Sequence, residues 1–460
     1  MRRRADRDVR LWRAACSLPW LLLSVMAARL AQATISYDVS AGVSATDNVR
    51  LTPTDTRSDT ITTVGLELDL LEQRRYFDAD VAANLNYLDY LKDSYSPGVI
   101  GNFLGDARVH IVQDRLTWDF ADNFGQAQIN PLQPVTPANR ENLNYFTTGP
   151  DLTLPLGSVF EMLLDARYSN VKYQTSPLSS NRYSEGGGLR RELSPSSYVS
   201  FNVSDEEIHF DNGNINPDYD QQEAYFRYHG EGIRTKLDVE LGVQRLQLPE
   251  GSTSLPMARA EATRQLSPFM SLIFTGGHEY SDAGDEFRLM QTLGGANLLT
   301  QAVQPTYSPF KNNYVTLEWK YTRERTGFGF QVGHFTMDYV AHSALSNALN
   351  EERTTFSANA TRHLTTNLQA DVLLSFERDD FEQALGNSNL LTGTVQLAWR
   401  AGRRISVVSE YDHARRQSEL RTTQYQDNAL WVKVRYGRIA DVPTGSAVPR
   451  LPALPGESTH

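Results

Sequence analysis

The chain has 460 residues, a formal net charge of −11 and 40% hydrophobic residues, with a mean hydropathy of −0.44. The acidic balance argues against nucleic acid as a partner, because such binding requires basic side chains that neutralise phosphates. The single cysteine, Cys16, excludes a disulfide framework.

Residues 1–33 have the layout of a secretory signal peptide. Arginines crowd residues 2–13, an apolar run follows from Ala14 to Ala28, and the sequence Ala31-Gln32-Ala33 supplies small residues at the expected cleavage positions. The apolar run is too short for a spanning helix, which needs about 20 residues. We therefore expect cleavage after Ala33, export from the cytoplasm, and a mature chain without cysteine.

Several segments of the mature chain alternate apolar and other side chains. In 315–321, apolar residues occupy positions 315, 317, 319 and 321, with Thr, Glu and Lys between them. The same period of two runs through 116–120, 160–168, 237–243, 368–376, 395–399 and 430–436. Because successive side chains of a strand point to opposite faces, each segment predicts a strand with one apolar and one polar face. The alternations are about as long as the 9–11 residues that a membrane-crossing strand needs.

Tight breaks interrupt this pattern at intervals of about 40 residues. They begin at Glu72, Gln113, Pro155, Ser194, Glu231, Ser267, Thr326, Thr365 and Gly402. Three of them share a motif of Arg, any residue and Leu, followed by Ser-Pro or Thr-Thr. We expect the arginines of this motif near a membrane edge; they are Arg191, Arg264 and Arg362. The repeat predicts hairpins of two long strands.

Longer, more polar connections lie between these turns. They fall near 47–59, 91–98, 125–140, 174–181, 211–219, 249–254, 282–309, 341–350, 381–389 and 417–426. Nine turns and ten loops predict about 20 strands, within a range of 16–20. The predicted fold class is all-β: a single antiparallel transmembrane up-and-down β-barrel at 34–439, with short periplasmic turns and long extracellular loops, in the cell outer membrane.

A WD-type propeller, which also repeats at about 40 residues, is the strongest soluble alternative. Its blades need four short strands per repeat, whereas this repeat holds two long ones. The pair Trp118-Asp119 is the chain's only Trp-Asp dipeptide, and Gly-His occurs out of phase with it. The propeller is therefore disfavoured.

The polar face of the strands carries charges of both signs, and in a barrel this face lines the lumen. We predict as pore-lining Glu67, Asp69, Asp78, Asp80, Arg115, Asp119, Glu161, Asp165, Arg167, Arg227, Lys236, Asp238, Glu240, Glu318, Lys320, Asp371, Arg400, Lys433 and Arg435. About 20 strands enclose a lumen too wide for side chains alone to fill. The longest loop includes the stretch LGGANLLTQAVQ, less polar than the other loops, and we hypothesise that 283–309 folds inward as a constriction; a mobile outward loop is the alternative.

No catalytic, metal or cofactor site is predicted. The sequence holds no Gly-rich phosphate loop, metal-ligand spacing or nucleophile elbow. His334 with Ser346 and Asn347 in the following loop offers a weak hydrolase reading. Carboxylate pairs such as Asp78 and Asp80 are better explained as solvated lining than as glycosidase acids. We expect a non-enzyme.

The start of the mature chain, ISYDVSAGVSATDNVRLTPTDTRSDTITTVGLELDL, resembles outer-membrane β-barrels found with exopolysaccharide operons and protein-sorting systems. Asp47, Asn48, Val49, Leu51 and Pro53 carry the resemblance, together with the Arg-x-Leu-Ser-Pro turns. It implies a channel for exopolysaccharide export or biosynthesis. A general or solute-specific porin and a barrel with a blocked lumen are the alternatives.

The resemblance and the barrel prediction together imply the partners: outer-membrane lipid, the barrel assembly machinery, polysaccharide and periplasmic export components, with no nucleic acid. The Pro-rich segment 440–460 is predicted to be an extended periplasmic tail. It is a departure from the family pattern, because outer-membrane barrels commonly end in an aromatic residue, whereas here Tyr436 is followed by this tail.

Overall fold

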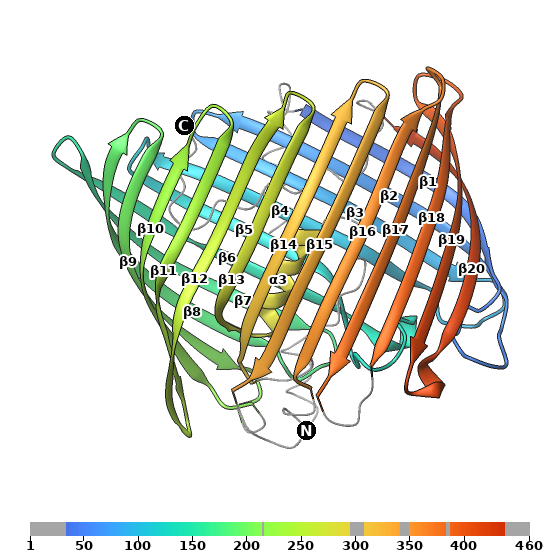
Figure 1. Cartoon of the computed structure of the whole chain (residues 1–460), viewed down its shortest axis with the longest axis horizontal. Coiled ribbons are helices and arrows are strands. Elements are labelled where there is room, and N and C mark those ends of the chain that lie inside the picture. The colour runs from blue at the N-terminus through green and yellow to red at the C-terminus, as the bar shows by residue number, and fades with distance from the viewer. Residues whose placement is uncertain (1–33, 214–215, 295–307, 341–348, 383–386, 438–460) are drawn as a thin grey trace, which may run out of the picture.

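Twenty antiparallel strands form one sheet that closes on itself (Figure 1). The structure is a computed structural model that describes residues 34–213, 216–294, 308–340, 349–382 and 387–437. The predicted signal peptide and the tail 440–460 lie outside the described residues. The strands are β1 (Thr34–Thr46), β2 (Asp59–Arg74), β3 (Phe77–Tyr90), β4 (Gly98–Val112), β5 (Leu116–Gln128), β6 (Arg140–Leu156), β7 (Phe160–Tyr173), β8 (Ser180–Ser194), β9 (Ser197–Phe210), β10 (Tyr219–Glu231), β11 (Thr235–Leu248), β12 (Gly251–Ser267), β13 (Met270–Ser281), β14 (Phe310–Arg323), β15 (Thr326–Tyr339), β16 (Glu351–His363), β17 (Leu368–Phe381), β18 (Ser388–Arg400), β19 (Ile405–Ser418) and β20 (Tyr425–Gly437).

The topology is the predicted up-and-down barrel. Each strand pairs with its sequence neighbours, and β1 closes the ring against β20 from Asp38 opposite Gly437 to Thr46 opposite Ala429. A closed ring leaves no unpaired sheet edge, so every strand finds backbone hydrogen bonds on both sides. The prediction of an all-β barrel with about 20 strands is confirmed.

Short turns gather at one rim and longer connections at the other. The connection near 249–254 was predicted to be a long loop, and this prediction is wrong: β11 and β12 continue until Leu248 pairs with Gly251. Leu246 and Leu255 pack there with Ile208 and Tyr219 in a buried cluster, and this apolar contact extends the ladder. The longer connections contain the 3-10 helices η1 (Pro137–Asn139) and η3 (Arg421–Thr423) and the α-helix α3 (Ala283–Gly294).

The two faces of the wall differ as the alternation predicted. Residues that lie opposite each other in paired strands share a face. The pairing register therefore shows, strand by strand, which residues belong to the inner face and which to the outer face. On β17, Leu374 is 50% exposed on the outer face, whereas Glu377 and Asp379 belong to the inward set together with Arg353 of β16, which lies opposite Asp379. Among the described residues, no helix has the length and apolar character needed to cross a membrane.

Residues Asp47, Asn48 and Val49 connect the end of β1 to β20, where the barrel closes. The backbone N–H and the side-chain amide of Asn428 on β20 donate to the Asp47 carboxylate at 2.9 and 2.7 Å. The Asn48 amide donates to the carbonyl oxygens of Thr52 and Gln426 at 2.8 and 2.9 Å, so it ties the first loop to β20. Val49 packs in a buried cluster with β2 and β3. These residues therefore help to close the barrel.

Candidate functional site

The helix α3 lies inside the barrel, between opposite parts of its wall (Figure 1). Asp282 precedes it and caps its N-terminus: one carboxylate oxygen accepts the backbone N–H groups of Gly284 and Asp285 at 2.8 and 3.0 Å. Such capping satisfies N–H groups that have no partner within the helix. The inward fold proposed for 283–309 thus holds for 283–294, while 295–307 lie outside the described residues.

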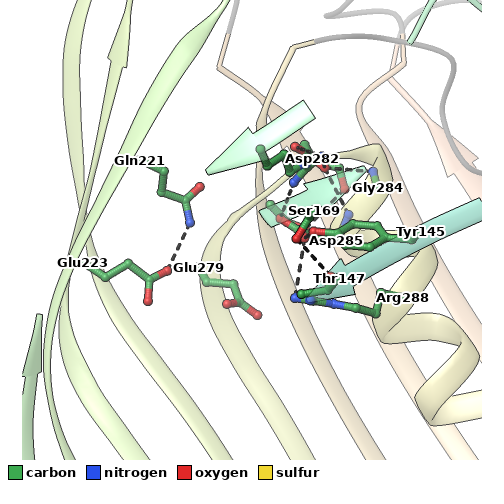
Figure 2. A network of polar contacts seen from close by, with 12 residues as sticks. Tyr145, Thr147, Ser169, Gln221, Glu223, Glu279, Asp282, Gly284, Asp285 and Arg288 are labelled. Atoms are coloured by element: carbon green, nitrogen blue, oxygen red, sulfur yellow. Dashed lines mark hydrogen bonds and ion pairs between the residues drawn. The ribbon is translucent and has the colours of Figure 1, made fainter. Parts of the chain in front are cut away.

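A buried ion network fixes the start of α3 to the wall. Arg182 of β8 donates two hydrogen bonds to the Asp282 carboxylate, at 2.7 and 2.8 Å, and one to Asp285 at 3.2 Å. Tyr219 of β10 donates its hydroxyl to Asp282 at 2.5 Å, and Tyr145 of β6 donates to Asp285 at 3.3 Å. Figure 2 shows Tyr145 and Asp285 side by side with Asp282. We call this network the latch.

The latch also sets the charge of the Asp282 carboxylate. Burial alone would raise the pKa of Asp282, but the positive charge of Arg182 and the hydrogen bonds from Arg182 and Tyr219 hold this pKa below its usual value. The side chains of Arg182 and Asp282 are only 3% and 6% exposed. A paired, hydrogen-bonded charge can be buried at this depth, whereas an unpaired one is costly.

Further contacts bind α3 to two separate parts of the wall. Phe287 packs with β5, β6 and β7 in one buried cluster, and Met290 packs with Tyr314 of β14 and Phe335 of β15 in another. Asn312 of β14 donates its side-chain amide to Glu286 at 2.9 Å. The helix therefore bridges the lumen.

The Glu286 side chain is buried between α3 and the wall. Burial raises the pKa of Glu286 to about 7, with the charge of Arg353 opposing the rise.

Gly125 of β5 leaves room for α3 against the wall. A Cβ at position 125 of β5 would lie 2.3 Å from the Gln291 amide nitrogen and 3.2 Å from the Phe287 ring. Gly125 thus leaves the space that α3 occupies.

The structure brings many of the predicted lining residues together in inward ion networks. Arg227 donates to Asp238 at 2.6 Å and lies 3.7 Å from Glu240. Arg435 lies 3.1 Å from Asp38 and also contacts Glu67. The other contacts of predicted residues are Arg167 with Asp151 and Asp119, Asp119 with Arg108, Glu161 with Arg190, Asp78 with His110, Lys320 with Glu318, Lys433 with Glu410, and Asp371 with Thr361 and Gln369.

The strand bounds and the pairing register place the remaining predicted residues. Arg115 lies in the tight turn between β4 and β5, so it stands at the rim and outside the strands. Arg400 ends β18, and Lys236 stands near the start of β11, both close to the short-turn rim. Asp69, Asp80 and Asp165 lie on inward positions of β2, β3 and β7.

Sequence reasoning missed several residues that organise the lumen. Arg182, Arg259 and Arg353 occupy strands with few large apolar residues, where alternation gives a weak signal. The sequence from Asp282 to Glu286 (DAGDE) does carry a recognisable helix start, an N-cap Asp followed by acidic residues in the first turn. It could have placed a helix within the longest loop.

The lumen is less polar near the long-connection rim than predicted. Inward side chains there form buried apolar clusters: Ile208, Tyr219, Leu246, Leu255 and Tyr280 in one, and Phe310, Met337, Tyr339 and Leu349 in another. This end of the lumen is therefore lined partly by apolar side chains. Within the described part of the chain, no group of three His, Cys, Asp or Glu side chains is arranged to hold a metal ion.

Among the described residues, His334 lies beside one hydroxyl and one carboxylate. It lies on β15, where its imidazole is 3.1 Å from the Thr354 hydroxyl and 3.8 Å from the Glu352 carboxylate. The hydrolase reading also named Ser346 and Asn347, which lie outside the described residues.

Residues 315–438 match the model of a family described as "Putative beta-barrel porin 2". This segment runs from β14 through β20. A search of curated proteins found no match.

Several solved structures align with most of this chain at low sequence identity. The FrpB iron transporter from Neisseria meningitidis is 11% identical, with a TM-score of 0.43 over 88% of this chain and 81% of that one. A ferric enterobactin receptor mutant from Pseudomonas aeruginosa is 7% identical, with a TM-score of 0.44 over 87% and 80%. The siderophore receptor PirA from Acinetobacter baumannii is 10% identical, with a TM-score of 0.42 over 88% and 80%. Similarity at this level carries no argument about cargo. Together with the fold, the family match defines a porin-like, outer-membrane-type β-barrel.

Proposed function

We propose that this chain is an outer-membrane channel that carries a hydrophilic cargo through a lumen constricted by α3. The observation that carries the proposal is the two-faced wall: an apolar belt outside and ion networks inside, on a ring with no free edge. Such a wall suits a bilayer outside and water inside. The role is transport rather than catalysis.

The constriction makes the channel narrower than its strand number implies. Barrels of about 16–18 strands already leave an aqueous channel, and this wall has 20 strands. Because α3 bridges the lumen, cargo has to pass beside it or displace it. We therefore expect small current steps from the purified protein in a planar bilayer, and absence of any current would contradict the channel proposal.

The more specific proposal is that the cargo is an exopolysaccharide, moved outward with periplasmic export components. It is supported by the resemblance around Asp47, Asn48 and Val49. A general or solute-specific porin is the alternative, and the bridging helix favours it, because an extended polymer needs a continuous wide path.

A deletion strain separates the two cargo proposals. Polysaccharide lost from the medium and accumulated in the periplasm, and restored by the full-length gene, would support export. Normal secretion with altered uptake of small solutes would support the porin. Fractionation of the same cells tests the outer-membrane location and the insertion by the barrel assembly machinery.

A further inference from the structure

We infer that the lumen conducts cations in preference to anions, so that its cargo is a cationic or uncharged hydrophilic solute. The inference rests on the proposed channel function and deepens it. It concerns the summed field of the whole inner wall and assigns no bound ion to any single group of carboxylates. The inference is carried by the excess of acidic over basic side chains in several parts of the wall.

The largest network, on β10 to β13, contains more carboxylates than bases. Arg259 lies 3.0 Å from Glu223 and 3.2 Å from Glu240, and it also contacts Glu279. Beside it, Arg227 pairs with Asp238 and approaches the same Glu240. Even when every base of this sector is paired with one carboxylate, unpaired carboxylates remain, so the sector has a net negative charge.

The same excess recurs around the ring. Arg353 and Arg435 each contact two carboxylates, and Arg167 does so as well; the acidic partners are Glu351 and Asp379, Asp38 and Glu67, and Asp119 and Asp151. The networks on β1, β2 and β20 and on β16 and β17 therefore contain more carboxylates than bases, whereas the network on β4 to β7 is balanced, because Asp119 also pairs with Arg108. Because the acidic networks lie in different sectors of the barrel, a permeating ion is surrounded by negatively charged wall on several sides.

A further stretch of the wall carries three neighbouring carboxylates. Asp80 of β3 lies directly opposite Asp106 of β4, and Asp69 belongs to the inward face of β2 next to it. No ion pair joins Asp69 or Asp80 to a basic side chain of the described residues, whereas the positive charges of Arg108 and Arg288 act on Asp106. Asp69 and Asp80 are exposed to the lumen. They add uncompensated negative charge where the wall is open.

The constriction brings permeating ions close to this charge. The first turn of α3 carries Asp285 and Glu286, and Asp282 precedes the helix; Arg182 and Arg288 offset part of this negative charge. Fields from charged walls act over about 10 Å at 0.1 M salt, and charged lumens of one sign raise the local concentration of counter-ions. A passage narrowed by α3 keeps ions within that range. A polyanionic cargo would be repelled, which restricts any polysaccharide cargo to neutral or cationic polymers.

The test is a reversal-potential measurement on the purified full-length protein in a planar bilayer with a KCl gradient near 0.1 M. We expect potassium permeability severalfold above that of chloride, and a ratio that falls towards one near 1 M salt, where screening acts over about 3 Å. The variant Asp69→Asn/Asp80→Asn/Asp106→Asn should lower the ratio.

The matched control removes the same number of charges from the outer face. Glu185→Gln/Asp205→Asn/Glu207→Gln changes residues on outward positions of β8 and β9, so its permeability ratio should equal that of the native protein. A native ratio at or below one, or equal ratios for the inner variant and the control, would overturn the inference while leaving a channel. Complete absence of current would overturn the channel proposal and, with it, this inference.

Discussion

Removing Arg182 should release α3 from the wall. In Arg182→Met, the Asp282 carboxylate stays buried and loses both hydrogen bonds from the guanidinium, at 2.7 and 2.8 Å. Breaking a buried pair by removing one partner costs about 3–5 kcal/mol. Asp282 keeps its bonds from Tyr219 and the helix N-terminus, so we expect the lower end, about 3 kcal/mol. That corresponds to a roughly hundredfold shift in the docking equilibrium.

The assay measures how fast a thiol on α3 reacts with a maleimide. Ala283, 6% exposed, is changed to cysteine in a background with Cys16→Ser, so that the probe is the only thiol. Labelling of the folded barrel then reports undocking of the helix. A folded barrel that is not heated before electrophoresis migrates differently from the heat-unfolded chain. If the variant keeps this difference in mobility, its wall remains closed.

The control is an exposed ion pair on the same barrel. Arg378 and Asp380 are 2.9 Å apart with side chains 53% and 30% exposed, and such pairs contribute about 0–1 kcal/mol. Arg378→Met should therefore leave the labelling rate nearly unchanged. Equal labelling rates for Arg182→Met and Arg378→Met, in folded barrels, would refute the latch. Adding Asp282→Asn to Arg182→Met should restore part of the protection, because a neutral amide then replaces the buried carboxylate that Arg182 had paired.

Three further predictions use the same reasoning. Gly125→Leu should undock α3 by about 1–3 kcal/mol through overpacking and speed labelling at position 283, whereas Gly98→Leu, whose added Cβ would meet nothing within 4 Å, should not; equal rates would contradict the fit. Because burial raises the pKa of Glu286 from 4.5 to about 7, the docked helix favours the protonated carboxyl, so docking should be strongest below about pH 4.5, weaken as the pH rises to about 7 and then level off. After correction for intrinsic thiol reactivity, labelling should rise over that range, and Glu286→Gln should reduce the rise; a pH dependence of labelling that is unchanged in Glu286→Gln would rule out this role of Glu286. Leu374→Arg on the outer belt should cost about 2–4 kcal/mol in urea titrations of the barrel in lipid vesicles, against less than about 1.5 kcal/mol for Leu374→Phe; an equal effect of both changes would argue against a lipid-facing surface.

The strand count could be predicted because barrel strands are local. Each strand is indicated by its own period-two alternation and by turn residues near positions such as 195 and 268. Each strand also pairs with its neighbours in sequence, so the strand count depends little on contacts between distant residues. The failure near 249–254 has a non-local cause. Leu246 and Leu255 are buried by Ile208 and Tyr219, which come from two other strands, and no local signal shows that this packing extends the hairpin.

The site was less predictable than the wall. Alternation identifies which side chains face inward, so it found Arg227, Asp238 and Glu240 together. It cannot show which inward residues meet across the lumen. The pairing of Arg182 with Asp282 joins residues 100 positions apart, and it depends on α3 crossing to that wall. The apolar clusters near the long-connection rim were missed for the same reason.

The most direct test of the account compares current through the native protein with current through a barrel that lacks the bridge. Ser281 and Phe310 are directly paired, so a two-residue Asn-Gly turn can replace residues 282–309. We expect small current steps for the native protein and larger steps for the barrel without α3 at the same salt concentration. Equal steps would contradict the constriction by α3, and no current from either protein would contradict the channel itself.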